Sequence, residues 1–386
     1  MMIAMAAVCC AAHDLAVQPA VAESPEPQTS LEPAVELEQR WRHPPRESGV
    51  RCWWWWLNGN VTKAAITKDL EAMHDKGFSG AMIFDADGSG QKGNRRVPEG
   101  PMFGSDEWTD LYLHALNEGK RLGLKLGLSI QSGWNLGGPR VPLDDAAKEV
   151  TWSETRIEGP ARIARRLPLP KHNSNDYRDI RVLAWPDRSP KASFKPIRDL
   201  PAKTASLELG GSAPDCRRLL NDHPAVEGEQ DALLEDVIDL TGKLGEDGVF
   251  SWDAPAGKWI VLRVGYTPTR GHVSTSSGKW QGHVIDYLSK EAFDNYWIDS
   301  VDPLLKKAGA MAGTVLTHLE TDSWECGGMN WTPKFEQEFR RYNGYDMAPY
   351  LPVVAGKIIE SRKASNAFLA DFRKTVSYTH LTLPTN

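Results

Sequence analysis

Acidic side chains gather at the end of one predicted strand. Glu320, Asp322 and Glu325 fall within six residues, directly after the apolar run at 314–319. Unpaired carboxylates beside a buried strand are costly, so this placement calls for a reason. Hydrolysis of a glycosidic bond supplies one, because it uses two carboxyl groups, one of them held protonated as the acid. The other interpretation is a set of solvated loop acids that pair with lysine or arginine.

Amides, carboxylates and indoles also follow three other predicted strands. They are Asn58 and Asn60 after 51–57, Asp85 and Asp87 after 81–84, and Gln131 and Trp134 after 124–130. The carboxyl ends of parallel strands meet at one edge, where α/β proteins bind ligands. Indoles stack on the apolar faces of sugars, and amides and carboxylates bind their hydroxyls. The pattern therefore predicts a sugar site, although the two aspartates also fit a hard cation or ordinary turn chemistry.

The remaining polar candidates have plainer interpretations. His318 fits a strand histidine better than a catalytic base, and His272 and His283 fit either the rim of a site or a loop surface. Cys326 follows the strand-end acids, but no His/Asn arrangement marks it as a nucleophile. The spacing of cysteine and histidine fits no zinc site.

The elements that must position these residues follow a βαβ pattern. Apolar runs and helical stripes alternate over residues 50–147, which predicts a parallel sheet. Residues 148–267 lose the helical period and read as a β-rich insertion, and the α/β rhythm returns over residues 268–376. We therefore expect a partial (β/α)8 TIM-type barrel of about four βα units, interrupted by an all-β insertion.

The composition narrows the classes of partner. The chain has 386 residues, a formal net charge of −6 and 15 tryptophans. The mild acidity argues against nucleic acid and against an anionic membrane surface. A neutral, hydroxyl-rich ligand fits both the charge and the many indoles.

Both ends of the chain differ from the body. Residues 1–12 form an uncharged apolar run, and small residues follow it up to Ala20 and Ala22, so residues 1–22 are predicted to be a secretory signal peptide rather than a membrane span. We therefore expect an exported protein: periplasmic, secreted or on the cell surface. Residues 23–49, rich in Pro, Glu and Ser, read as a flexible tether. Residues 377–386 lose the helical period of 365–376, and we interpret them as an artefactual tail.

Several motifs resemble a known family. They are WWWWLNGNVTK at 53–63, IFDAD at 83–87, QSGWNLGGP at 131–139 and TDSWECGGMNWTPKFEQEFRRYNGYD at 321–346. In this order they are similar to glycoside hydrolase family 106, the α-L-rhamnosidases, and the resemblance runs from about residue 44 to residue 376.

The resemblance implies an exported enzyme with a (β/α)8 catalytic domain, an inverting mechanism and a calcium ion near the sugar. The glutamate of the DSWE motif maps onto Glu325, whose role as acid or base stays open. The second catalytic glutamate of the family lies beyond residue 376, and the resemblance assigns no metal ligand. The chain thus reads as an N-terminal part of the catalytic region.

We expect release of terminal α-L-rhamnose from plant-type glycans, with Glu325 as one of the two catalytic carboxyl groups. The residues expected to bind the sugar are Asp322, Asp85, Asn58, Asn60, Gln131, Trp134, Trp56 and Trp324. The alternatives are an exo-glycosidase for another sugar and a non-catalytic sugar-binding remnant.

Overall fold

The computed structural model describes residues 32–90, 93–188, 194–207, 216–323 and 328–380. The contacts between residues divide the chain into two units. The first unit comprises residues 1–134, 275–280 and 301–322, and the second unit comprises residues 135–274, 281–300 and 323–386. Each is described by itself.

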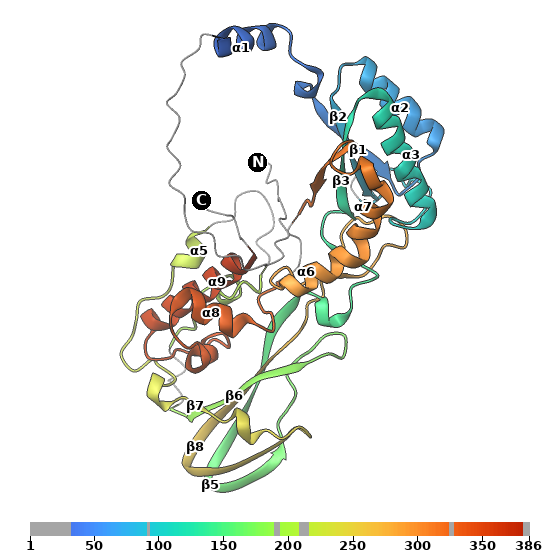
Figure 1. Cartoon of the computed structure of the whole chain (residues 1–386). Coiled ribbons are helices and arrows are strands. Elements are labelled where there is room, and N and C mark those ends of the chain that lie inside the picture. The colour runs from blue at the N-terminus through green and yellow to red at the C-terminus, as the bar shows by residue number, and fades with distance from the viewer. Residues whose placement is uncertain (1–31, 91–92, 189–193, 208–215, 324–327, 381–386) are drawn as a thin grey trace, which may run out of the picture. The chain divides into compact units, whose positions relative to one another are not determined.

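The first unit is built on a parallel sheet of four strands. Their order is β1 (Arg51–Leu57), β2 (Gly80–Ala86), β3 (Lys125–Ser132) and β10 (Leu316–Glu320). All three neighbouring pairs are parallel (Figure 1). The expected parallel sheet is therefore confirmed.

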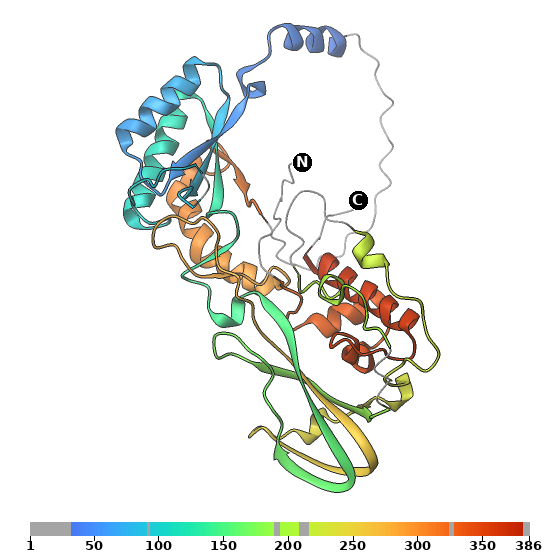
Figure 2. The same cartoon turned by 180° about the vertical axis from the view of Figure 1, so that it is seen from behind.

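Helices cover one face of this sheet (Figures 1 and 2). They are α2 (Lys63–Asp75), α3 (Asp106–Leu122) and α7 (Asp302–Ala308). The Thr62 hydroxyl accepts a hydrogen bond from the amide of Ala65 and begins α2, and Ser105 does the same for Trp108 in α3. Gly123, in the left-handed conformation, ends α3 and turns the chain into β3.

The tryptophan run of β1 divides between the two faces. Trp54 and Trp56 are buried on the helix side, where the Trp54 indole donates to Asp69 of α2 and Trp56 packs on Trp108 of α3. Successive residues of a strand point to opposite faces. The two tryptophans between them are therefore on the other face.

The second unit is built on antiparallel strands. The larger sheet has the order β5 (Lys148–Arg166), β8 (Val249–Pro268), β6 (Arg178–Pro186) and β7 (Ile238–Asp239). The smaller one pairs β4 (Gly137–Gly138) with β9 (His283–Val284). The segment expected to be an all-β insertion thus contains antiparallel sheet, but it also contains two short helices, α4 (Leu200–Lys203) and α5 (Arg217–Leu220), so it is not all-β.

Helices α8 (Phe335–Asn343) and α9 (Arg362–His380) share a core with the larger sheet. Phe335, Phe339, Phe368 and Phe372 supply its aromatic part. Helix α8 and most of α9 lie in the segment 268–376 that we expected to continue the α/β layer, and in this structure they pack on the antiparallel sheet. Helix α9 also continues through residues 377–380, where the sequence predicted that the helical period ends.

The other helices are short or peripheral. They are α1 (Glu32–Arg42), α4 (Leu200–Lys203), α5 (Arg217–Leu220) and α6 (Lys290–Tyr296), the last of which continues through a π-helical turn (Trp297–Val301) into α7. Helix α1 falls within the segment expected to be a tether, and the expected signal peptide lies outside the described residues.

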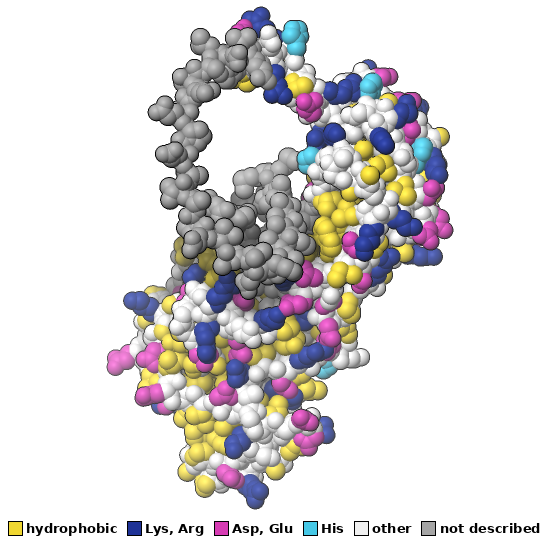
Figure 3. All heavy atoms as spheres, in the orientation of Figure 1, with side chains coloured by type: hydrophobic (Ala, Val, Ile, Leu, Met, Phe, Trp, Pro, Cys, Tyr) yellow, Lys and Arg dark blue, Asp and Glu magenta, His cyan; other side chains and the backbone are white. Residues whose placement is uncertain are grey.

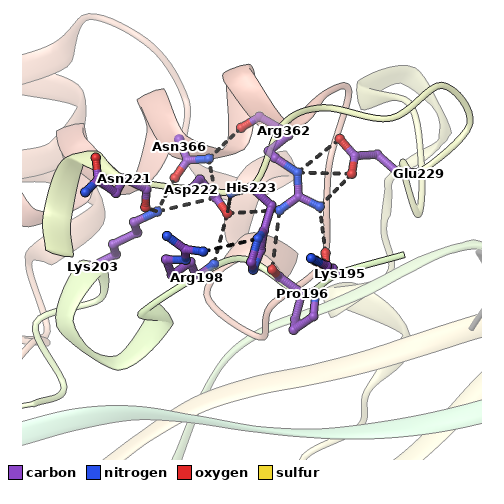
Figure 4. A network of polar contacts seen from close by, with 10 residues as sticks. All are labelled: Lys195, Pro196, Arg198, Lys203, Asn221, Asp222, His223, Glu229, Arg362 and Asn366. Carbon is purple, nitrogen blue, oxygen red and sulfur yellow. Dashed lines mark hydrogen bonds and ion pairs between the residues drawn. The ribbon is translucent and has the colours of Figure 1, made fainter. Parts of the chain in front are cut away.

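A buried polar network ties α9 to the loops that precede it in sequence. Arg362 donates to both carboxylate oxygens of Glu229, at 2.5 to 3.1 Å, and to Asp222 at 3.1 Å. Lys203 reaches Asp222 and Asn366 from the other side (Figure 4). Each of these charged side chains has a partner of opposite charge, so the protein tolerates the burial of the whole network.

Candidate functional site

The expected polar strand ends meet at one edge of the first unit. Since β1, β2, β3 and β10 are parallel neighbours, the residues at their carboxyl ends share the same edge of the sheet. This edge carries Asn58, Asp85, Gln131 and Asp322. The structure thus brings these strand-end residues together, as the sequence predicted, but their side chains play different parts.

Asp85 is buried on the helix side of the sheet. Its Oδ1 accepts a 2.5 Å hydrogen bond from the Ser132 hydroxyl, and its Oδ2 accepts a 3.0 Å bond from the Trp108 indole. Burial raises the pKa of Asp85 to about 6, although Ser132, Ser277 and Trp108 each lower it in part. The side chain therefore connects β2, β3, α3 and the segment 275–280.

Asn58 organises the turn after β1. It adopts a left-handed backbone with φ 55°, its amide nitrogen donates to the Val97 carbonyl at 2.9 Å, and its Oδ1 accepts from the Gly278 amide at 2.8 Å. Two loops distant in sequence are thus fixed to one side chain. Asn60, two residues later, is exposed.

Gln131 links the ends of β3 and β10. Its Oε1 accepts a 2.8 Å hydrogen bond from the Thr321 hydroxyl, and its amide nitrogen donates to the Gly133 carbonyl at 3.3 Å. The side chain is fully buried. The sugar contacts predicted for Gln131, Asn58 and Asp85 stay predictions, while the structure shows what each side chain does within the protein.

The face of the sheet away from the helices carries exposed aromatic side chains. Trp53 and Trp55 are 44% and 39% exposed. Trp55 packs on Phe84 and Trp134, with ring centroids 4.8 and 5.4 Å apart. Figure 3 shows hydrophobic side chains gathered on this part of the first unit. We call this surface the open face.

The tryptophans on the open face are not all those that the sequence predicted. Trp134 belongs to it, whereas Trp56 is fully buried against the helices. Trp324 lies outside the described residues. A run of four tryptophans does not reveal which alternate pair faces outward, so the sequence singled out Trp56 and passed over Trp53 and Trp55. Their exposure makes these two the better stacking surfaces.

Register extends the open face to β10. Trp54, Ile83 and Leu128 are in register on the helix side, so the residues that follow them, Trp55, Phe84 and Ser129, point to the open face. Glu320 is the partner of Ser129 and lies on the same face. Trp55, Phe84, Ser129 and Glu320 thus form one row across the open face, which begins at an indole and ends at a carboxyl group.

Glu320 is a second acid of this edge, beside Asp85, whose pKa is raised. Burial and, after it, repulsion from Asp322 raise its pKa to about 7, although the Ser129 hydroxyl lowers it in part. The sequence placed Glu320 among three strand-end acids but gave it no separate role. Asp322 is exposed, and Glu325, the expected catalytic residue, lies outside the described residues.

Arg51 and His318 make a contact across the open face. Arg51 Nη1 lies 2.7 Å from His318 Nδ1, although β2 and β3 separate their strands. The nearby positive charge lowers the pKa of His318, after burial, which is the larger cause. His272 and His283 contact each other in the second unit, with ring centroids 4.9 Å apart and the ring planes tilted by 37°.

The described residues contain no cluster of the side chains that most often bind metal ions. Across the ranges that the structure describes, no three His, Cys, Asp or Glu side chains come together as ligands. In the same ranges, no helix is both long and apolar enough to cross a membrane.

Comparison with known proteins gives matches to a family profile, to a curated protein and to solved structures. The profile of the alpha-L-rhamnosidase family, glycoside hydrolase family 106, matches residues 42–195 and 219–381. A protein of Formosa agariphila named "Putative beta-glucuronidase" is 36% identical over 353 residues, which cover 90% of this chain and 29% of that protein.

One of the matching solved structures is a rhamnosidase from Novosphingobium sp. PP1Y. It superposes with a TM-score of 0.75 at 24% identity, over 89% of this chain and 45% of the other. This chain therefore spans less than half the length of either relative. The structural likeness supports a shared fold, and the profile match covers most of the sequence. The chain belongs to the alpha-L-rhamnosidase family, glycoside hydrolase family 106.

Proposed function

We propose that the natural protein releases terminal α-L-rhamnose from plant-type glycans by an inverting acid/base mechanism. The family match over most of the chain is the observation that carries the proposal. The shared edge of carboxylates, amides and indoles supports it, because these are the groups that bind sugars.

Glu325 is the proposed catalytic carboxyl group of this chain. In an inverting glycosidase the partner carboxyl lies roughly 6.5–9.5 Å away, which leaves room for the attacking water. That partner is the glutamate expected beyond residue 376. Asp322, Asn60 and Trp134 keep their proposed roles around the sugar, whereas the exposed Trp53 and Trp55 take the stacking role first proposed for the buried Trp56.

The scaffold that we propose is part of a (β/α)8 barrel. Parallel sheets are normally covered on both faces or closed into a barrel. In the first unit, α2, α3 and α7 cover one face, while the other presents Trp53 and Trp55 to solvent. This one-sided covering supports the interpretation that the open face is part of the inner face of a barrel.

Three further properties rest on the resemblance or on the N-terminal sequence. They are a calcium ion near the sugar, export by the peptide at residues 1–22 and a rhamnose-containing glycan as the partner. Loss of rhamnosidase activity in a chelator, with recovery on addition of Ca²⁺, tests the first. N-terminal sequencing of the mature protein tests the second, and the substrate panel described below tests the third.

A second candidate is a glycosidase that acts on a uronic acid. The observation that favours it is the name of the Formosa agariphila relative, to which this chain is 36% identical. The two candidates share a scaffold and differ in the terminal sugar. A sugar-binding remnant without activity is the non-enzymatic alternative.

A panel of aryl glycosides separates these candidates in the intact natural protein. The proposal expects turnover of the α-L-rhamnoside and little of the β-D-glucuronide. Glu325→Gln should lower kcat by at least about a hundredfold with the fold intact, as loss of a general acid or base does. Glu107→Gln, an exposed substitution on α3, should leave kcat unchanged. Normal turnover by Glu325→Gln would remove Glu325 from the mechanism.

A further inference from the structure

Glu320 occupies a distinctive position on the open face. It is the last residue of β10, at the edge where the four strands end, and its partner in the sheet is Ser129. The row that contains both residues begins at Trp55, whose indole is partly exposed. A ligand stacked on this face would therefore lie along a row that ends in a carboxyl group.

Two buried polar atoms in this row are poorly satisfied. The Ser129 hydroxyl interacts with the Glu320 carboxyl and lowers its pKa in part, but within the described part of the chain neither Glu320 Oε2 nor the Ser129 hydroxyl makes a hydrogen bond of good geometry. Buried polar atoms of native proteins are nearly always satisfied by protein, water or ligand. The Glu320 side chain as a whole is only half-buried, so this corner of the open face is not sealed.

The charges around Glu320 favour its neutral form. Asp322 adds a negative charge, and no lysine or arginine among the described residues forms an ion pair with Glu320. His318, two residues earlier on the same strand, faces Arg51. Because burial and Asp322 raise its pKa to about 7, Glu320 still carries its proton in a large fraction of molecules near neutral pH.

We propose that Glu320 is a further sugar-binding residue of this site and holds a hydroxyl of the terminal sugar through its carboxyl group. The inference deepens the proposed function and rests on it. The neutral carboxyl donates the hydrogen bond to the sugar oxygen. Ionisation removes this donor, so binding weakens as the pH rises through the pKa of Glu320.

Titration of the intact natural protein with free L-rhamnose tests this, because calorimetric binding needs no turnover. The wild-type dissociation constant should rise roughly five- to tenfold between pH 6 and pH 8.5, as expected for loss of one hydrogen bond. Glu320→Gln keeps a donor of the same shape, so its affinity should match the low-pH wild type and stay constant across this range. Glu320→Ala should bind weakly at every pH.

Two variants serve as controls. Glu107→Gln makes the same chemical change at an exposed position of α3 and should reproduce the wild-type pH profile. Asp322→Asn removes the neighbouring negative charge, so the midpoint of the profile should move to lower pH. Thermal unfolding followed by circular dichroism checks that each variant is folded. If Glu320→Ala does not fold, the inference is tested by comparing the pH dependence of L-rhamnose binding in Glu320→Gln with that of the wild type.

The possible outcomes separate the inference from the proposed function. Two results would overturn the inference and leave the proposed function standing. One is an affinity of Glu320→Ala equal to that of the wild type, and the other is a Glu320→Gln affinity that depends on pH as the wild-type affinity does. A wild-type protein that neither binds L-rhamnose nor cleaves an α-L-rhamnoside overturns both. A flat Glu320→Gln profile beside a pH-dependent wild type supports the assignment.

Discussion

The indole nitrogen of Trp108 donates a 3.0 Å hydrogen bond to Oδ2 of Asp85, a carboxyl group that is 1% exposed. This contact joins α3 to the carboxyl end of β2. Together with the bond from Ser132, it makes Asp85 part of the framework behind the polar edge.

The buried carboxyl should make stability depend on pH. The pKa of Asp85 is raised from 3.8 to about 6, so the folded protein binds the proton more tightly than the unfolded chain. The contribution of protonated Asp85 to the free energy of unfolding is therefore fully present below pH 4 and is lost as the pH rises through 6. The full change is about 3 kcal/mol. Asp85→Asn should remove this dependence in urea unfolding between pH 4 and 7.

The matched control is Asp253→Asn, at an exposed position of β8. The difference in unfolding free energy between Asp253→Asn and the wild type should stay nearly constant over the same range. If the Asp85→Asn profile also runs parallel to the wild type, Asp85 does not titrate differently in the folded protein.

Breaking the buried ion pair between Arg362 and Glu229 should strongly destabilise the second unit. Arg362→Met leaves the Glu229 carboxylate buried without its partner, which costs about 3–5 kcal/mol. The double variant Arg362→Met/Glu229→Met should recover part of the loss, because no Glu229 charge then remains. Urea unfolding of the wild type, both single variants and the double variant measures the coupling.

An exposed pair in the same unit provides the comparison. Arg341 and Glu338 lie 3.2 Å apart on the surface of α8, with the arginine 69% exposed. Arg341→Met should cost less than about 1 kcal/mol. Equal effects of Arg341→Met and Arg362→Met would show that burial does not strengthen the Arg362 contact.

Gly59 should tolerate no side chain. A Cβ there would lie 2.4 Å from the Pro101 carbonyl oxygen, and φ is +63°. Gly77 has a similar φ of +83°, but nothing lies within 4 Å of its Cβ position. Gly77→Ala should therefore cost about 1–2 kcal/mol from backbone strain alone. Gly59→Ala should cost clearly more, and equal losses in thermal unfolding would contradict the close approach.

Neighbouring tryptophans of β1 should respond differently to truncation. Trp56→Ala empties a buried site beside Trp108 and should cost about 3–5 kcal/mol. Trp55→Ala, on the open face, should cost appreciably less in the 386-residue chain. Denaturant unfolding of both variants checks the assignment of faces, and a larger loss in Trp55→Ala would reverse it.

Much of the scaffold was predictable because its signals are local. The apolar run 51–57 matches β1 residue for residue, and Thr62 and Ser105 begin helices as their side chains predict. The parallel pairing followed from the alternation of strands and helices. Each of these rests on a few adjacent residues and on no long-range contact.

The contacts that the strand-end side chains make within the protein could not be predicted from the spacing of these residues in the sequence. Asp85 and Glu320 both stand at strand ends, yet one faces the helices and the other the open face. That difference depends on the pleat and on register shifts in β2 and β3. The amide of Asn58 is engaged by loops around 97 and 278, whose approach no local pattern encodes.

The short segment 275–280 belongs to the first unit, although residues 135–274 before it belong to the second. It supplies Ser277, which contacts Asp85 and Ser132, and Trp280, which packs on Phe103. During synthesis the ribosome therefore releases β1, β2 and β3 long before the residues that complete their surroundings. The first unit must wait, partly assembled, while the whole antiparallel sheet is translated, and a chaperone would meet it in that state.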